Sequence, residues 1–149
     1  MNIGFQFDVT YKDNELIELR TSAWNGAFGG RADVYVGIAQ LQVIASSLRG
    51  FPSHPADTRE VMFGAFGPGS AGGGVSMRFH CADGSGHAYV ESTIESGEKT
   101  ASVPETVTLL LPIEASAVDA FVEQLHHLSV NAVGTALLMG CQSRGKGVR

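Results

Sequence analysis

The chain has 149 residues, of which 15 are acidic and 10 basic, giving a formal net charge of −5, and 44% are hydrophobic. These values exclude a disordered protein and indicate one globular domain large enough to bury a core without disulfides or metal ions. The acidic balance also argues against a nucleic-acid-binding protein, which would present a basic surface, and is compatible with a basic protein partner.

Four further classes are disfavoured by local features. The N-terminus alternates apolar and polar residues instead of forming the apolar core of a signal peptide, and no run reaches the ~18 apolar residues of a membrane span. We therefore expect a cytoplasmic protein that contacts no membrane. Cys81 and Cys141 are too few for a disulfide framework. The glycine-rich run at 67–74 lacks the Lys-Ser/Thr of a phosphate-binding loop, so no cofactor is predicted.

The first two predicted strands form a pair near the N-terminus. Apolar residues recur at every second position from Ile3 to Tyr11, and Ile17 and Leu19 continue this face in a second strand. Pairing Val9 with Leu19 and Tyr11 with Ile17 requires an odd number of connecting residues. The connection should therefore be a longer loop or contain a bulge.

Three aromatic residues surround the next loop, which runs from residue 24 to residue 30. Trp24, Phe28 and Tyr35 are aromatic side chains beside a glycine-rich turn, and Tyr35 belongs to a predicted strand over 32–36. Aromatic residues near loops are frequent in interaction sites. They serve equally well as plugs that close one end of a sheet, and the sequence leaves both interpretations open.

A helix is predicted next, over residues 37–49. Apolar residues recur at helical spacing between Ile38 and Leu48, and Gly50 and Pro52 stop the helix. A strand over 59–66 follows, with Val61 and Phe63 on one side.

The stretch from Val75 to Ile94 predicts its own pairing as a β-hairpin. A turn at residues 84–85 sets a register in which one face of the hairpin is mostly apolar. This face pairs Cys81 with Ala88, Phe79 with Val90, Met77 with Ser92 and Val75 with Ile94. The other face pairs His80 with Tyr89, Arg78 with Glu91 and Ser76 with Thr93. Pattern and turn agree, as a hairpin requires.

The polar face of this hairpin is the candidate ligand site. Its residues are Arg78, His80, His87, Tyr89 and Glu91. In a cleft they could hold a small anionic or polar ligand, and on a flat face they would be a solvated surface. His80 and His87 are diagonal neighbours in this register and could share a metal ion. Since zinc sites need three or four ligands, no metal site is predicted.

The last part of the chain contains a strand over 106–111, which Pro112 should end, and a helix over 115–128. The segment 130–141 is apolar and uncharged, so it should pack on the core or on a second subunit. Residues 143–149 are polar and basic, which is typical of a flexible tail.

Together these elements predict an α+β fold. We expect a single domain over residues 1–142 with an antiparallel or mixed sheet of five to seven strands and two amphipathic helices on one face. Residues 143–149 would form the flexible basic tail.

Several short motifs resemble small, uncharacterised bacterial single-domain proteins. They are Gly26-Ala-Phe-Gly29, Leu48-Arg-Gly-Phe-Pro52, Val75-Ser-Met-Arg-Phe79 and Ala117-Val-Asp-Ala-Phe121. The chain also resembles immunity-type proteins of bacterial toxin systems in size, charge and fold class. The first resemblance implies no catalytic residues, and the second implies a partner protein that is neutralised.

The leading hypothesis is therefore a non-enzymatic protein-interaction module, of immunity type on the second resemblance. The alternatives are a small-ligand binder that uses the hairpin face, and an enzyme or His-ligated metal protein whose site is not recognisable. A homodimer is also predicted, because sheet edges need protection and the segment 130–141 needs a surface to cover.

Overall fold

The computed structural model describes residues 2–97 and 103–141, which form eight strands and two helices. The α+β class, the antiparallel pairing and the two helices are confirmed. The single sheet of five to seven strands is wrong, because the strands form two four-stranded antiparallel sheets. The predicted tail at 143–149 lies outside the described residues.

Sheet A has the strand order β3-β2-β1-β8, and sheet B has the order β4-β5-β6-β7. The strands of sheet A are β1 (Gly4–Lys12), β2 (Leu16–Trp24), β3 (Gly29–Gly37) and β8 (Thr135–Met139). Those of sheet B are β4 (Thr58–Gly64), β5 (Gly74–Cys81), β6 (His87–Glu95) and β7 (Thr106–Glu114).

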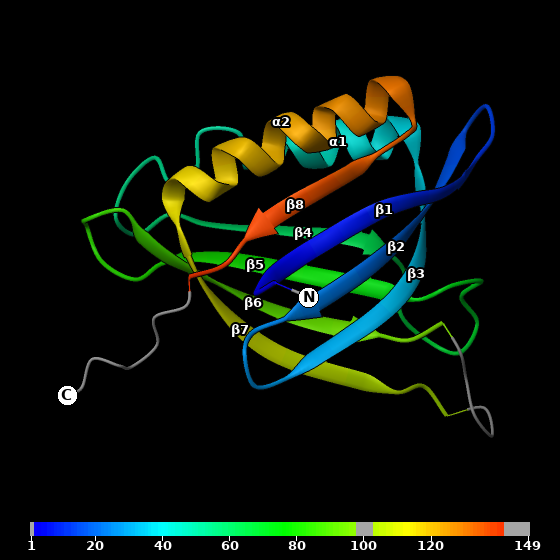
Figure 1. The fold of residues 1–149 in the computed structure, drawn as a ribbon, viewed down its shortest axis with the longest axis horizontal. Coiled ribbons are helices and arrows are strands. Elements are labelled where there is room, and N and C mark those ends of the chain that lie inside the picture. The colour runs from blue at the N-terminus through cyan, green and yellow to red at the C-terminus, as the bar shows by residue number, and fades with distance from the viewer. Residues whose placement is uncertain (1, 98–102, 142–149) are drawn as a thin grey trace.

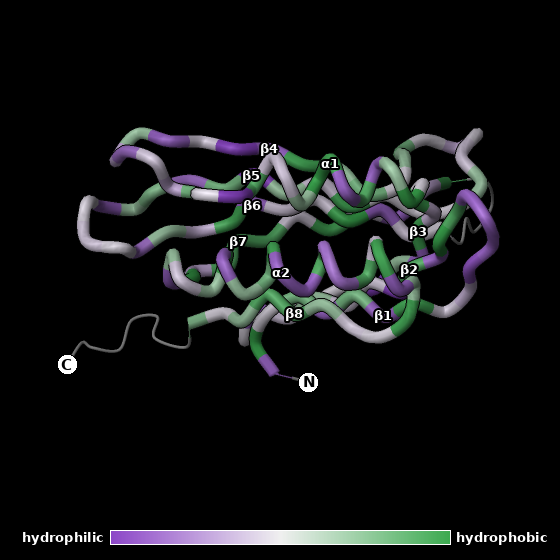
Figure 2. Tube along the Cα trace, turned by 90° about the horizontal axis from the view of Figure 1, so that it is seen from above, coloured by the Kyte–Doolittle hydropathy of each residue, from purple (hydrophilic) through white to green (hydrophobic). Residues whose placement is uncertain are grey.

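The two sheets face each other across one core, and the helices lie side by side along one open side between them (Figures 1 and 2). Phe7 of sheet A has its ring 4.6 Å from that of Phe63 in sheet B and 5.6 Å from that of Phe121 in the second helix. In both sheets the strands bury one side, which is mostly apolar. Since both sheets contribute such a side, each buries the apolar side of the other.

The helices end close to their predicted positions. Helix α1 spans Ile38–Leu48 and helix α2 spans Ala115–Asn131, three residues beyond the predicted end. Ala132 closes α2 in the left-handed conformation, with its N–H donating to the carbonyl of Leu128. In the described part of the chain, neither helix has the length and apolarity that crossing a membrane demands.

The hairpin register predicted between Val75 and Ile94 is confirmed. Strands β5 and β6 pair as expected on both faces, including His80 with Tyr89, Arg78 with Glu91 and Phe79 with Val90. The first pair of strands also contains the expected irregularity. Val9 pairs with Leu19 as predicted, but the predicted pair of Tyr11 with Ile17 is wrong. A bulge within the strand pair shifts the register, so that Tyr11 lies opposite Glu18 and Lys12 opposite Ile17.

The structure corrects the predicted end of the last long strand and decides between the two alternatives for the segment 130–141. Pro112 does not end its strand, because β7 is an edge strand and can lose one N–H group at no cost to the ladder with β6. The segment 130–141 packs within its own chain, since β8 pairs with β1 and buries Ala136 and Leu138. The apolar segment 130–141 therefore no longer supports a homodimer. The homodimer stays a prediction that rests on the exposed sheet edges alone.

Candidate functional site

The predicted polar face of the hairpin becomes the solvent-facing side of sheet B. Arg78, Glu91 and Leu110 are neighbours across β5, β6 and β7, and His80, Tyr89 and Pro112 form the next row. Although Arg78 lies beside Glu91, its guanidinium is 3.4 Å from the carboxylate of Glu60 on β4.

His80 is held between its neighbours on this face. Its ring stacks on that of Tyr89 at a centroid distance of 4.8 Å, and its Nε2 is 3.5 Å from the carboxylate of Glu91. This nitrogen is buried and has no hydrogen-bond partner in the part of the chain that the structure describes. Stacking and burial fix the ring in one position.

His87, at the start of β6, lies between two carboxylates. Its Nδ1 is 2.9 Å from Asp83 and its Nε2 is 3.9 Å from Glu114. The hydrogen bond with Asp83, followed by the charges of both carboxylates, raises the pKa of His87. The pKa of Asp83 is lowered, first by the N–H of Ser85 and then by His87.

Cys141 extends this cluster at the edge of β7. Its thiol is 3.6 Å from the carboxylate of Glu114, and burial is the main reason that the pKa of this thiol is raised. Because the thiolate is the nucleophilic form of cysteine, these surroundings do not activate Cys141 as a nucleophile. The thiol instead donates a hydrogen bond to Glu114.

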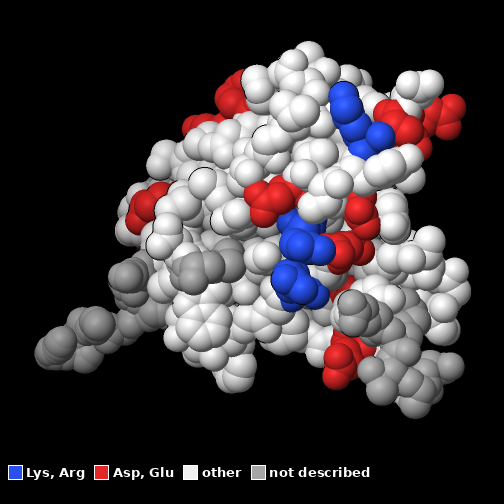
Figure 3. Space-filling model, turned by 45° about the vertical axis from the view of Figure 1, so that its right-hand side comes forward, with Lys and Arg blue, Asp and Glu red and all other residues white. Residues whose placement is uncertain are grey.

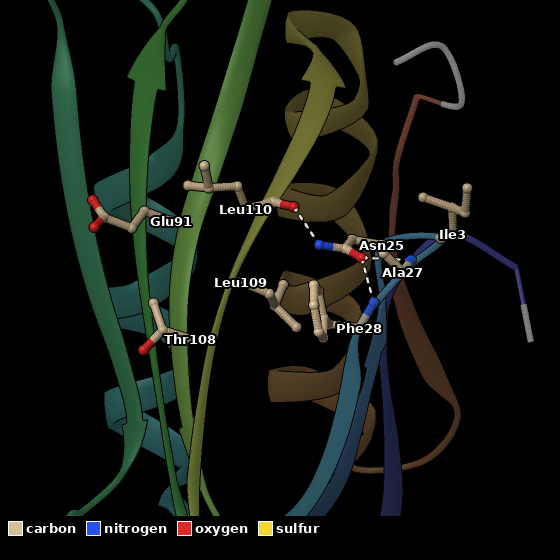
Figure 4. Close-up of a pocket in the computed structure, with 9 residues that line it drawn as sticks. Ile3, Asn25, Ala27, Phe28, Glu91, Thr108, Leu109 and Leu110 are labelled. Carbon is tan, nitrogen blue, oxygen red and sulfur yellow. Dashed lines mark hydrogen bonds between the residues drawn. The ribbon is translucent and has the colours of Figure 1, made fainter. Parts of the chain in front are cut away.

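Two hollows lie along β7 and share Leu110; we call them together the β7 groove. The first has a volume of about 860 Å³ and is shown in Figure 4; its lining comprises Ile3, residues 25–28, Glu91 and residues 108–110. The second has a volume of about 720 Å³ and is lined by Ala82, residues 87–89, Leu110, residues 112–114 and Cys141. Apolar surface predominates in both.

One wall of the first hollow is the loop that joins β2 to β3, and Asn25 holds it in place. The side-chain oxygen of Asn25 accepts hydrogen bonds from the N–H groups of Ala27 and Phe28, at 2.9 and 2.7 Å. Its side-chain nitrogen donates to the carbonyl of Leu110 on β7, at 2.9 Å (Figure 4). A single amide therefore shapes the loop and fastens sheet A to the edge of sheet B.

Only three of the five predicted ligand residues line the β7 groove. Glu91 lines the first hollow, and His87 and Tyr89 line the second. Arg78 and His80 lie beside them on the same face but line neither hollow. Ligand binding by this set stays a prediction.

The three predicted interaction aromatics also separate. Phe28 lines the first hollow and is 64% exposed. Trp24 lies at the same end of sheet A, in one row with Gly4 and Met139. Tyr35 lies further along β3, opposite Glu18, whose hydrogen bond raises the pKa of the phenol.

The side of sheet A that faces solvent has a different character. Acidic and basic side chains interleave on it (Figure 3), and Arg20 forms an ion pair of 3.0 Å with Asp33. The carboxylate of Asp8 accepts hydrogen bonds from Gln6 and Thr135 in the same region. Charges here are largely matched within the sheet.

Leu110, Asn25 and Glu114 are among the site residues that the sequence did not single out. Leu110 lies on the polar side of β7, between Thr108 and Pro112, and is 51% exposed. An apolar residue in a polar position of an alternating strand was the available signal. For Asn25 the Asn-Gly pair indicated a turn, but not its bond to β7, 85 residues away.

Comparisons of the chain with protein-family models, with curated proteins and with solved structures each return no match. Within residues 2–97 and 103–141, no three His, Cys, Asp or Glu side chains come together in a group that could hold a metal ion.

Proposed function

We propose that this protein is an interaction module whose contact surface is the β7 groove. The observation that carries the proposal is the exposure of two large apolar side chains on one hollow, Phe28 and Leu110, which are 64% and 51% exposed. Both side chains line the larger hollow, and neither is covered by another element within residues 2–97 and 103–141. Large apolar side chains that gather in a hollow are typical of surfaces that bind a partner.

The rigidity of the surroundings supports the same proposal. The floor is part of an antiparallel sheet, and the loop wall is fastened by Asn25 through three hydrogen bonds. A contact surface that is already in its bound shape loses less conformational entropy on association.

Retention of partners from the native lysate tests the proposal. We expect the wild type to retain a stoichiometric partner and Leu110→Asp to lose it, because a carboxylate at the centre of the groove must be desolvated on binding. Val43→Asp is the matched control, since Val43 is an apolar residue of α1 that is 66% exposed. A partner retained equally by all three proteins would contradict the proposal.

Neutralisation of a toxin-like partner is a narrower proposal. It rests on the resemblance of the sequence to immunity-type proteins and on the acidic net charge. Its test is direct: the retained partner should lose its own activity on binding the wild type and keep it in the presence of Leu110→Asp.

Small-ligand binding is the second candidate function, and the second hollow favours it. Its volume of about 720 Å³ lies in the range of small-molecule sites, and it combines an apolar wall with His87, Tyr89 and Glu114. A small-molecule fragment screen followed by NMR should then shift the signals of Tyr89 and Ala88. Fragment hits confined to other surfaces would remove this candidate.

A further inference from the structure

We infer that the β7 groove binds an extended segment of a partner protein with the pattern basic–x–apolar–x–basic, its two basic side chains reaching Glu91 and Glu114. The inference rests on the proposed function and adds the chemistry of the partner.

The spacing of the two carboxylates sets the pattern. Glu91 lies directly across from Leu110, and Glu114 follows Leu110 by four residues on β7. Four residues of a strand span about 13 Å. The row between them is Tyr89 with Pro112, which offers an apolar surface midway. In an extended segment, residues i, i+2 and i+4 lie on one side over the same length.

Both carboxylates are available to a partner. Glu91 and Glu114 have side chains that are 46% and 54% exposed. Neither forms an ion pair with a lysine or arginine among the described residues. Each carboxylate lies beside a histidine, Glu91 beside His80 at 3.5 Å and Glu114 beside His87 at 3.9 Å. Glu114 also accepts a hydrogen bond from the thiol of Cys141, and Arg78 pairs with Glu60. The net charge of −5 attracts a basic segment from further away.

The partner segment is bound by side chains on the solvent-facing side of sheet B. It does not pair with the edge of β7 as an added strand. Pro112 has no N–H to offer along the edge of β7. The carbonyl of Leu110 already accepts from Asn25, and that of Pro112 accepts from the N–H of Cys141, at 2.9 and 2.8 Å. The edge between residues 110 and 112 is therefore closed to a backbone ladder.

Selection from a library of random heptapeptides displayed on phage, against the immobilised full-length protein, tests the inference. At low salt we expect enrichment of Lys or Arg at positions four apart with an apolar residue between them. Peptides selected by the wild type and synthesised should bind Glu91→Gln and Glu114→Gln about two- to five-fold more weakly, as expected for exposed ion pairs. Glu123→Gln, whose parent residue pairs with Arg49 on the helical side at 2.7 Å, should bind like the wild type.

The possible outcomes distinguish an error in the partner's sequence pattern from an error in the choice of the β7 groove as contact surface. Enriched peptides that lack paired basic residues but lose affinity for Leu110→Asp would overturn this inference and leave the interaction module standing. Basic enrichment that persists unchanged with Glu91→Gln and Glu114→Gln would also overturn it, because other carboxylates would then be responsible. If selection on the wild type matches that on Leu110→Asp, both the inference and the groove as contact surface are wrong.

Discussion

Asp57 is a charged residue buried where α1 meets β4. Its carboxylate accepts from Arg59 at 2.8 Å and from the backbone N–H of Ser53 at 2.8 Å. The guanidinium of Arg59 also donates to the carbonyls of Ser47 and Arg49. One ion pair thus fastens the end of the helix to the sheet.

The first prediction concerns this pair. Asp57→Asn should lower the free energy of unfolding by about 2 to 4 kcal/mol at pH 7, because Arg59, whose side chain is 24% exposed, is left without its counter-charge. The hydrogen bond from Arg59, followed by those from Ser53, holds the pKa of Asp57 below its ordinary value of 3.8. The carboxylate therefore stabilises the fold fully above pH ~4 and loses this effect on further acidification. Urea unfolding between pH 7 and pH 2 measures both.

Asp33→Asn is the control for Asp57→Asn. The ion pair of Asp33 with Arg20 is exposed on sheet A, so its loss should cost less than about 1 kcal/mol. Equal destabilisation by the two substitutions would contradict the assignment of a structural role to Asp57.

His87 allows the second prediction, at the end of the β7 groove. Asp83→Asn should lower the pKa of His87 toward its ordinary value of 6.5, because the hydrogen bond with Asp83 is the main reason that this pKa is raised. Glu114→Gln should lower it less, since Glu114 is 3.9 Å away. NMR titration of the imidazole measures the pKa in each variant. A larger effect of Glu114→Gln would show that the ring is oriented differently.

Among the elements, β8 contributes to the core out of proportion to its five residues. Ala136 and Leu138 are buried, and the N–H of Leu137 donates to the side chain of Gln124 on α2 at 2.7 Å. The strand thus completes sheet A and attaches α2 to it.

The third prediction compares two neighbouring leucines of β8. Leu138→Ala should lower the free energy of unfolding by about 2 to 5 kcal/mol, the range for truncating a leucine in a packed core. Leu137→Ala should cost about 1 kcal/mol or less, because its side chain is half-buried on the opposite side of the strand. Chemical denaturation of both variants measures the difference. Similar values would mean that β8 does not pack as described.

Elements formed by residues close in sequence could be predicted, and elements that depend on distant residues could not. The hairpin of β5 and β6 was predicted to the residue because its turn and both of its faces lie within 20 residues. Strand β8 was not, since five residues give little periodicity and its partner β1 lies at the other end of the chain. The continuation of β7 through Pro112 depended on its place at an edge, which local sequence does not contain.

At the scale of the molecule, one aromatic cluster joins the two sheets and the helical layer. Phe7, Phe63 and Phe121 come from sheet A, sheet B and α2, and their rings are in contact. A core shared in this way makes the sheets depend on one another for stability.

The fourth prediction follows from this shared core. Trp24, the single tryptophan, reports on sheet A, and far-UV circular dichroism reports on the whole chain. Their urea transitions should coincide, and Phe7→Ala should move both to lower urea by a loss of about 3 to 5 kcal/mol. Two separate transitions would show that the sheets unfold independently.

The arrangement of the sheets was beyond the sequence for a related reason. Alternation in β1 and β6 shows that each strand has a buried side, but not which surface buries it. Seven predicted strands with one apolar side fit a single sheet under two helices as well as two sheets face to face. The groove was missed for the same reason, because Phe28 and Leu110 line one hollow only when the two sheets face each other.

The pairing of β1 with β8, in which Gly4 lies opposite Met139, has a consequence for synthesis on the ribosome. Strand β1 is translated before β8, and one of its edges and part of its apolar side stay uncovered until β8 has followed. At about 5 to 20 residues per second, this interval lasts roughly 7 to 27 seconds. During that time β1 has an open backbone edge, and its apolar residues Phe5 and Phe7 lack part of their final cover. A chaperone that binds nascent apolar strands would bind in this interval.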